Sequence, residues 1–168
     1  MASEIIGKVL IVANSAENLM EYNLCLENRF EIRNSPTLDS TLDLLDDFEP
    51  DVVVIDENIS NSSALEISEA IRSDNVSNSY TGIVVIADKE NHNLDQLRHS
   101  CVADFVTPRV TAKQMLEMFV CSAHRIKALE NKSKALISKL AMTKETVKEL
   151  EGLDSIKIPP LSKVFSVQ

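Results

Sequence analysis

The chain has 168 residues, of which 44% are hydrophobic and 26% are charged, and its formal net charge is −9. A chain of this length and composition can bury a substantial core, which excludes an intrinsically disordered protein. The negative net charge argues against a protein that binds the nucleic-acid backbone over its whole surface. Residues 1–110 carry a formal charge of −13, whereas residues 111–168 carry +4. Two regions of different character are therefore expected.

Five short runs rich in β-branched residues predict five strands. Three of them are continuously apolar, as in strands that are buried on both faces of a parallel sheet. The predicted strands are Val9–Val12, Phe30–Arg33, Asp51–Ile55, Gly82–Ala87 and Asp104–Thr107.

Segments with helical spacing of apolar residues alternate with these strands. The predicted helices are Ala16–Asn28, Leu38–Phe48, Ala64–Ile71 and, with the weakest pattern, Asn93–Ser100. Ser15, Thr37 and either Ser62 or Ser63 stand at the N-cap positions. Strict alternation predicts a doubly wound α/β fold, in which ligands bind at the carboxyl ends of the strands.

The cysteines and the apolar runs indicate the compartment. Cys25, Cys101 and Cys121 are odd in number and lack CxxC spacing, so neither a disulfide framework nor a zinc site is predicted. The apolar stretch at residues 9–13 is too short for a signal sequence, and no stretch approaches the roughly 20 apolar residues of a membrane span. We expect a cytoplasmic protein that does not contact a membrane.

The segments KVLIVANSAEN, EPDVVVIDENIS, TGIVVIAD and VADFVTPRV surround four of the strands. In order and spacing, residues 7–130 resemble the receiver domain of bacterial response regulators. The resemblance implies a flavodoxin-like five-stranded parallel sheet of order 2-1-3-4-5. It places Asp56 at the position of the phosphoacceptor aspartate and Phe105 at that of the switch aromatic.

The remaining site positions depart from the family pattern. Two acidic residues, a Thr or Ser, and a Lys are expected at the ends of the first, fourth and fifth strands. The degenerate positions here are Ala13, Asn14, Ala87 and Pro108.

These departures remove the groups that phosphoryl transfer needs. Transfer to a carboxylate depends on charge neutralisation by Mg²⁺ and a cation, and Mg²⁺ prefers carboxylate oxygens. Ala13 offers no oxygen, Asn14 offers one carbonyl, and Arg109 is the nearest candidate for the missing cation. We predict no catalytic residue and no metal or other cofactor site, with weak Mg²⁺ binding at Asp56 as the alternative.

Two of these positions also have a purely structural interpretation. Asp56 could simply accept backbone N–H bonds in the turn that follows its strand. For Phe105 we favour a core or groove-lining aromatic over a rotameric switch.

The second region predicts a long helix. Residues 111–151 contain neither glycine nor proline, and Gly152 follows, so one helix over Thr111–Glu151 is expected. A heptad pattern with Phe119 at position a is sustained along it, which is typical of a coiled coil. The apolar residues of the predicted seam are Phe119, Ile126, Leu129, Leu136, Leu140, Val147 and Leu150.

The direction of pairing is open at this point. Arg125 and Glu130 would attract each other in a parallel pair, whereas Lys139 and Lys144 would repel each other. Alternatives to self-association are a helix that folds back after Lys127, one that bends near residues 131–133, and one that binds another protein's helix.

The predicted organisation is a receiver-like domain at 1–127, a helical extension at 128–152 and an extended or disordered tail at 153–168. The predicted function is that of a non-enzymatic pseudo-receiver of two-component type, which forms homodimers and binds another signalling protein. One alternative is a response regulator phosphorylated at Asp56. Another is a truncated DNA-binding regulator, because residues 142–150 resemble the first helix of a helix-turn-helix unit, although the sequence argues against nucleic-acid binding.

Overall fold

The computed structural model describes residues 4–57, 59, 62–73, 81–87, 96–97, 100 and 102–154. The chain divides into two compact units, Met1–Glu130 and Asn131–Gln168. The first unit is an α/β domain. The described part of the second unit, residues 131–154, is helical.

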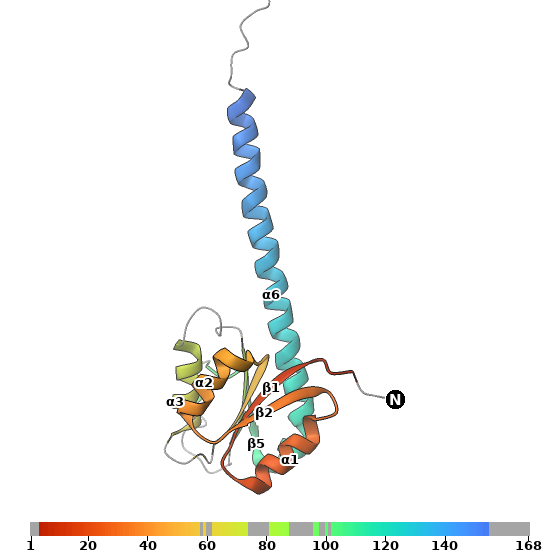
Figure 1. Cartoon of the computed structure of the whole chain (residues 1–168), viewed down its shortest axis with the longest axis vertical. Helices are drawn as coiled ribbons and strands as arrows, with labels where there is room; N and C mark the ends of the chain where they lie inside the picture. Colours follow the sequence, from red (N-terminus) through yellow and green to blue (C-terminus); the bar gives the residue numbers. More distant parts are fainter. Residues whose placement is uncertain are drawn as a thin grey trace, which may run out of the picture. The chain divides into compact units, whose positions relative to one another are not determined.

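The domain is built on a five-stranded parallel sheet (Figure 1). The sheet order β2-β1-β3-β4-β5 confirms the predicted topology. The strand predicted at Gly82–Ala87 has the predicted ends, and the ends of the other strands differ from the predicted ones by at most two residues. Backbone pairing extends past the apolar runs in the first two strands, as where Ser35 pairs with Val12. The strands are β1 Gly7–Val12, β2 Phe30–Ser35, β3 Val52–Asp56, β4 Gly82–Ala87 and β5 Phe105–Pro108.

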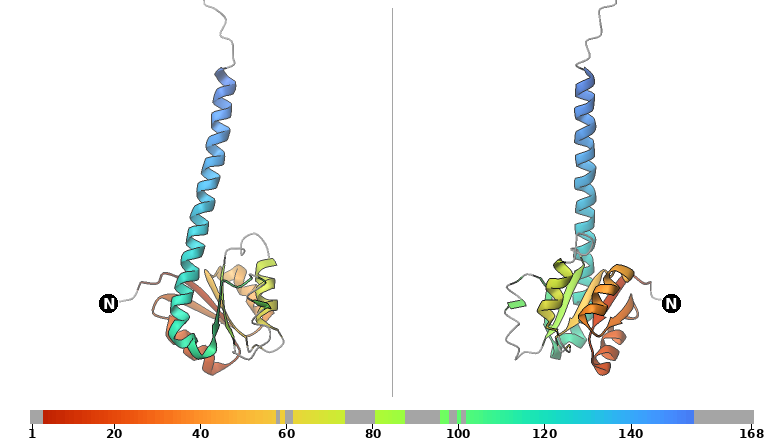
Figure 2. Two further views of the ribbon diagram at one scale, coloured as in Figure 1. Left: turned by 180° about the vertical axis from the view of Figure 1, so that it is seen from behind. Right: turned by 60° about the vertical axis from the view of Figure 1, so that its left-hand side comes forward.

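Both faces of the sheet are covered by helices, which explains the continuously apolar strands. Successive residues of a strand point to opposite faces, so Val9 and Ile11 enter one core cluster while Leu10 and Val12 enter the other. Helix α1 (Ala16–Leu26) and the first part of α6 (Arg109–Asp154) cover the first face. Helices α2 (Leu38–Phe48) and α3 (Ala64–Ser73) cover the second, as the views in Figure 2 show.

The N-caps follow the expected residue types. Ser15 caps α1, and Thr37 forms a capping box with Ser40 at α2. At α3 the cap is Ser63: its Oγ accepts a bond from the Glu66 N–H at 3.2 Å, and the Glu66 carboxylate accepts one from the Ser63 N–H at 2.8 Å. The bond from the Ser63 N–H, together with a second one that the Ser63 hydroxyl donates to the same carboxylate at 3.1 Å, lowers the pKa of Glu66. Of the predicted helix at 93–100, only residues 96, 97 and 100 lie in the described part of the chain, and all three are helical.

Helix α6 is longer than predicted at both ends. It begins at Arg109, continues through Asn131–Ser133 without interruption, and passes Gly152 to end at Asp154. A glycine in a helix interior costs about 1 kcal/mol of stability relative to alanine, and this cost is smaller within the last turn. Residues 142–150 therefore belong to this helix and do not start a separate one.

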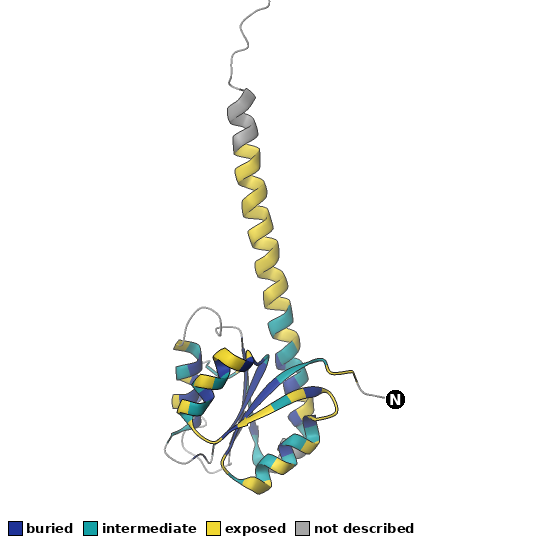
Figure 3. Cartoon of the chain, viewed as in Figure 1, coloured by how far each residue is buried: buried dark blue, intermediate teal, exposed yellow. Residues whose placement is uncertain are grey.

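The two parts of α6 differ in burial. Leu116, Val120 and Ala123 are buried in the domain core, whereas residues 129–148 are exposed throughout (Figure 3). Despite its length, α6 is not apolar enough to cross a membrane, and neither is any other helix among the residues described.

The C-cap of α2 offers a test of backbone strain. Glu49 is the non-glycine residue with positive φ (50°) in the described structure. An L side chain is disfavoured there by about 1 kcal/mol, so Glu49→Gly is expected to raise the free energy of unfolding by about 0.5–1 kcal/mol. Urea denaturation would measure this, with Glu49→Ala as the control that retains a Cβ. Equal stability of the two variants would contradict the strain.

Candidate functional site

The centre of the site is a buried carboxylate at the carboxyl edge of the sheet. Asp56 is the last residue of β3 and is only 1% exposed. Arg109, the first residue of α6, binds it with two hydrogen bonds: Nη1 donates to Oδ2 at 2.7 Å and Nη2 donates to Oδ1 at 2.5 Å. This bidentate geometry is the strongest form of an arginine–carboxylate bond, and it neutralises the aspartate within the protein.

Two side chains of α1 also donate hydrogen bonds to Asp56. The Tyr22 hydroxyl donates to Oδ2 of Asp56 at 2.9 Å, and Asn18 Nδ2 donates to the same oxygen at 2.9 Å. Arg109 Nη1 also donates to the Tyr22 oxygen at 3.0 Å. Burial, and next the neighbouring Asp56 charge, raise the pKa of Tyr22. The phenol therefore stays a neutral donor, and we call these four residues the Asp56 cluster.

The fold brings the Asp56 cluster together from three elements. Asn18 and Tyr22 are four residues apart on α1, so they lie on the same helix face. Arg109 follows β5 directly, and α1 and the start of α6 pack on the same face of the sheet. Sequence reasoning named Arg109 as a candidate cation but missed Asn18 and Tyr22. Their i, i+4 spacing just after β1 was the available signal.

The other predicted site positions offer no carboxylate. Ala13 and Ala87 are fully buried, Pro108 is half-buried beside Ala87 in the β4–β5 ladder, and Asn14 is exposed. No group of three or more His, Cys, Asp or Glu residues close enough to hold a metal ion occurs among the residues that the structure describes.

These residues do not fit a Mg²⁺ ion. A hard divalent cation needs several anionic or carbonyl oxygens. Here the one buried carboxylate of the Asp56 cluster already receives the positive guanidinium of Arg109 on both oxygens. A second cation at the same oxygens would be repelled by Arg109.

Phe105 has an ordinary packing environment. It is half-buried on β5, and its ring lies 5.3 Å, centroid to centroid, from that of Phe119 on α6. Both rings pack against the same core cluster. Phe119, predicted as the first seam residue, is therefore half-buried against its own domain, and its place in the seam stays a prediction.

A second ion pair fixes the other end of the domain part of α6. Lys127 Nζ lies 3.1 Å from Asp51 Oδ1 and donates to the Pro50 carbonyl at 3.0 Å. Asp51 precedes β3 and Asp56 ends it. The segment Arg109–Lys127 is therefore tied to both ends of the central strand.

The fold, but not the sequence, has clear counterparts among solved structures. No protein-family model and no curated protein matches the chain. A signal receiver domain of a putative LuxO repressor from Vibrio parahaemolyticus superposes with a TM-score of 0.66 at 14% identity, covering 77% of this chain and 98% of its own. A receiver domain from Clostridium thermocellum gives 0.65 at 18% identity, with 74% and 98% covered.

A third match extends into the helical region. A chain in which a trimeric coiled-coil segment of yeast Spc42 is fused to another structure gives a TM-score of 0.69 at 15% identity. It covers 95% of this chain and 100% of its own. At these identities the matches show the fold alone: the domain has the fold of response-regulator receiver domains.

Breaking the Asp56–Arg109 pair on one side should strongly destabilise the domain. Arg109→Met leaves a buried carboxylate without its cation and is expected to lower the free energy of unfolding by about 2–4 kcal/mol. The double variant Asp56→Asn/Arg109→Met should lose at least 1 kcal/mol less than the sum of the single variants. Urea denaturation of the four proteins measures both quantities.

The matched control is Arg29→Met. It removes the ion pair with Glu117, whose two side chains are 46% and 50% exposed, and should cost no more than about 1 kcal/mol. A loss at Arg109 as small as that at Arg29 would show that the buried pair contributes little.

Proposed function

We propose that this protein is a non-enzymatic pseudo-receiver of two-component type, which acts by self-association and by binding another signalling protein. The observation that carries the proposal is the Asp56 cluster, in which Arg109 occupies both oxygens of the phosphoacceptor-equivalent carboxylate. An engaged and neutralised carboxylate is a poor nucleophile. The domain is then held in one conformation and is not switched by phosphate.

The chemistry around Asp56 supports this interpretation. Acyl-phosphate formation adds negative charge that Mg²⁺ and a lysine must neutralise. Ala13 and Pro108 stand where those groups would be supplied, and Ala87 has no hydroxyl to respond to a phosphate. For Arg109 to serve as the missing cation, it would first have to release Asp56.

The exposed part of α6 supports self-association. Leu129, Leu136 and Leu140 are each more than 60% exposed, and Val147 is 46% exposed. All four lie on the a and d positions of one heptad pattern, so a partner helix could bury them together. The proposed organisation follows: a receiver-like domain at 1–127, a coiled-coil extension at 128–152 and a tail at 153–168.

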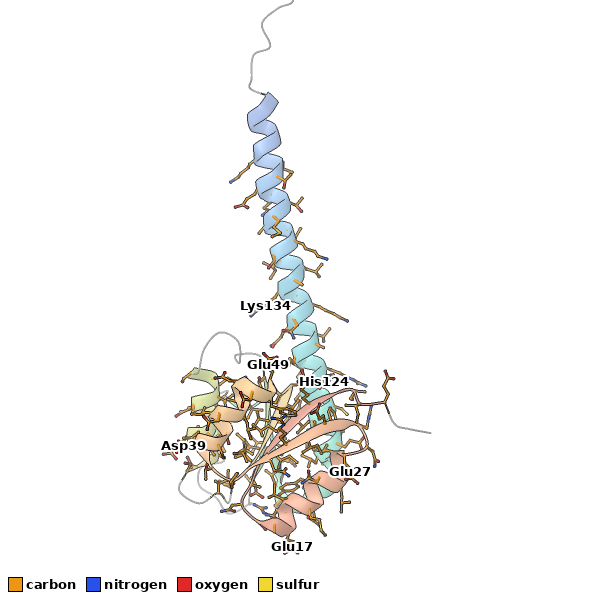
Figure 4. All side chains as sticks on the ribbon, in the orientation of Figure 1. Glu17, Glu27, Asp39, Glu49, His124 and Lys134 are labelled. Atoms are coloured by element: carbon orange, nitrogen blue, oxygen red, sulfur yellow. The ribbon has the colours of Figure 1, made fainter. Side chains whose placement is uncertain are left out.

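The surface charge of the domain indicates the kind of signalling partner. Glu17, Glu27, Asp39 and Glu49 are exposed on and around α1 and α2 (Figure 4). Asp56 is the buried carboxylate at the edge of the sheet, whereas most of the other described acidic side chains of residues 1–110 are exposed. A partner with a basic docking surface fits this charge.

Phosphorylation is the first test. The protein is incubated with acetyl phosphate and Mg²⁺ and its intact mass is measured, with a receiver known to accept phosphate as positive control. We expect no mass increase, because Asp56 is bound by Arg109 and no Mg²⁺ ligand set surrounds it. A gain of one phosphoryl group that Asp56→Asn abolishes would establish a working phosphoacceptor instead.

Self-association is the second test. Light scattering of the full chain should give a mass above that of the 18.7 kDa monomer. Leu136→Ser/Leu140→Ser should shift it to the monomer, because two apolar layers of the seam are lost. The matched control Ala135→Ser/Ala141→Ser places the same polar residues outside the a and d positions and should leave the mass unchanged. Dissociation by both variants would point to general loss of helix rather than to the seam.

A further inference from the structure

We infer that two copies of α6 pair in an antiparallel direction, in the register that sets Leu136 of one copy opposite Leu140 of the other. The inference rests on the proposed self-association and specifies its direction and register. It is carried by three features of the exposed helix: the polar residues within the seam, the isoleucine beside it, and the charges on its flanks.

The polar residues of the seam select the register. In an antiparallel coiled coil each a residue faces a d residue of the second copy. With Leu136 opposite Leu140, Leu129 faces Val147 and Ser133 faces Thr143. Apolar side chains then meet apolar ones and the two hydroxyl side chains meet each other. A shift by one heptad would set Ser133 against Leu136 or Leu140 against Thr143.

Ile137 supports the antiparallel direction. It is 64% exposed and lies at an e position, beside the seam rather than in it. In an antiparallel pair e positions face e positions, and in this register Ile137 meets Ile137 of the second copy at the two-fold axis. In a parallel pair each Ile137 would instead lie beside Lys132 of the other copy, so the dimer would contain two contacts between an apolar and a charged side chain.

The flanking charges also favour this direction. The e positions on either side of Ile137 are Glu130 and Lys144, so the antiparallel register makes two Glu130–Lys144 pairs across the dimer. Its one like-charge contact is Lys139 with Lys139 at the g positions. A parallel pair would make two attractive Arg125–Glu130 contacts but also two repulsive Lys139–Lys144 contacts. Both directions contain two polar layers, so the flanks decide between them.

Lys144→Glu changes the dimer affinity in opposite senses for the two directions. In the antiparallel pair it turns two Glu130–Lys144 attractions into repulsions, which should raise the dimer Kd about tenfold at low salt. In a parallel pair it would relieve the repulsion by Lys139 and lower the Kd. Sedimentation equilibrium of the full chain, at a series of concentrations in low-salt buffer, measures the difference.

Two further variants control the experiment. Lys148→Glu makes the same charge change at a b position, away from the seam, and should leave the Kd within about twofold of the original. The charge swap Glu130→Lys/Lys144→Glu should restore the original Kd, because the cross-dimer pairs are re-formed with reversed sign.

Each outcome has one meaning. Weaker association by Lys144→Glu with rescue by the swap supports the antiparallel register. Tighter association, or a trimer, overturns the register but leaves self-association standing. A wild-type monomer at every concentration overturns both the register and the proposed self-association.

Discussion

The bidentate contact between Arg109 and Asp56 is the constraint around which the domain is arranged. Burying a carboxylate is costly unless its charge is matched and its oxygens are bonded, and here Arg109, Tyr22 and Asn18 do both. The contact joins the end of the central strand to the first residue of α6. With Lys127 bound near the other end of that strand, it sets where the long helix begins and how its first part lies on the sheet.

The same contact changes what the receiver fold can do. In receiver domains that accept phosphate, a cation and a metal ion at the carboxyl edge of the sheet stabilise the negative charge of the phosphoryl group. Here the charge is balanced by side chains of the chain itself. A carboxylate held in this way favours one conformation of the domain. In the function that we propose, the surfaces of such a domain, rather than chemistry at Asp56, are the functional elements.

The structure shows where the acidic residues of the first region and the basic residues of the second region lie. Most of the described acidic residues of the first region are exposed, where their charge contributes to solubility. Part of the basic excess of the second region lies along the exposed part of α6, where Lys132, Lys139 and Lys144 flank the predicted apolar seam. Like charges on such flanks do not prevent pairing, but they restrict the directions and registers in which two helices can meet.

The sequence by itself determined the five strands, their order through the family resemblance, the helix caps and the long helix. These features follow from local rules: apolar periodicity, capping residues and the absence of glycine and proline act over a few residues. Through the same resemblance it predicted that Ala13, Asn14, Ala87 and Pro108 stand at positions where the family has its charged and hydroxyl side chains.

Only the tertiary structure decided which side chains surround Asp56. The hydrogen bonds between the three elements of the Asp56 cluster join residues that are 34 to 87 positions apart in the chain. No local pattern encodes that Tyr22 and Arg109 donate to the same oxygen. Likewise the heptad pattern included Phe119, but only the folded domain shows that its ring also packs against Phe105. Periodicity identifies which residues can be buried, whereas the folded chain decides against what they are buried.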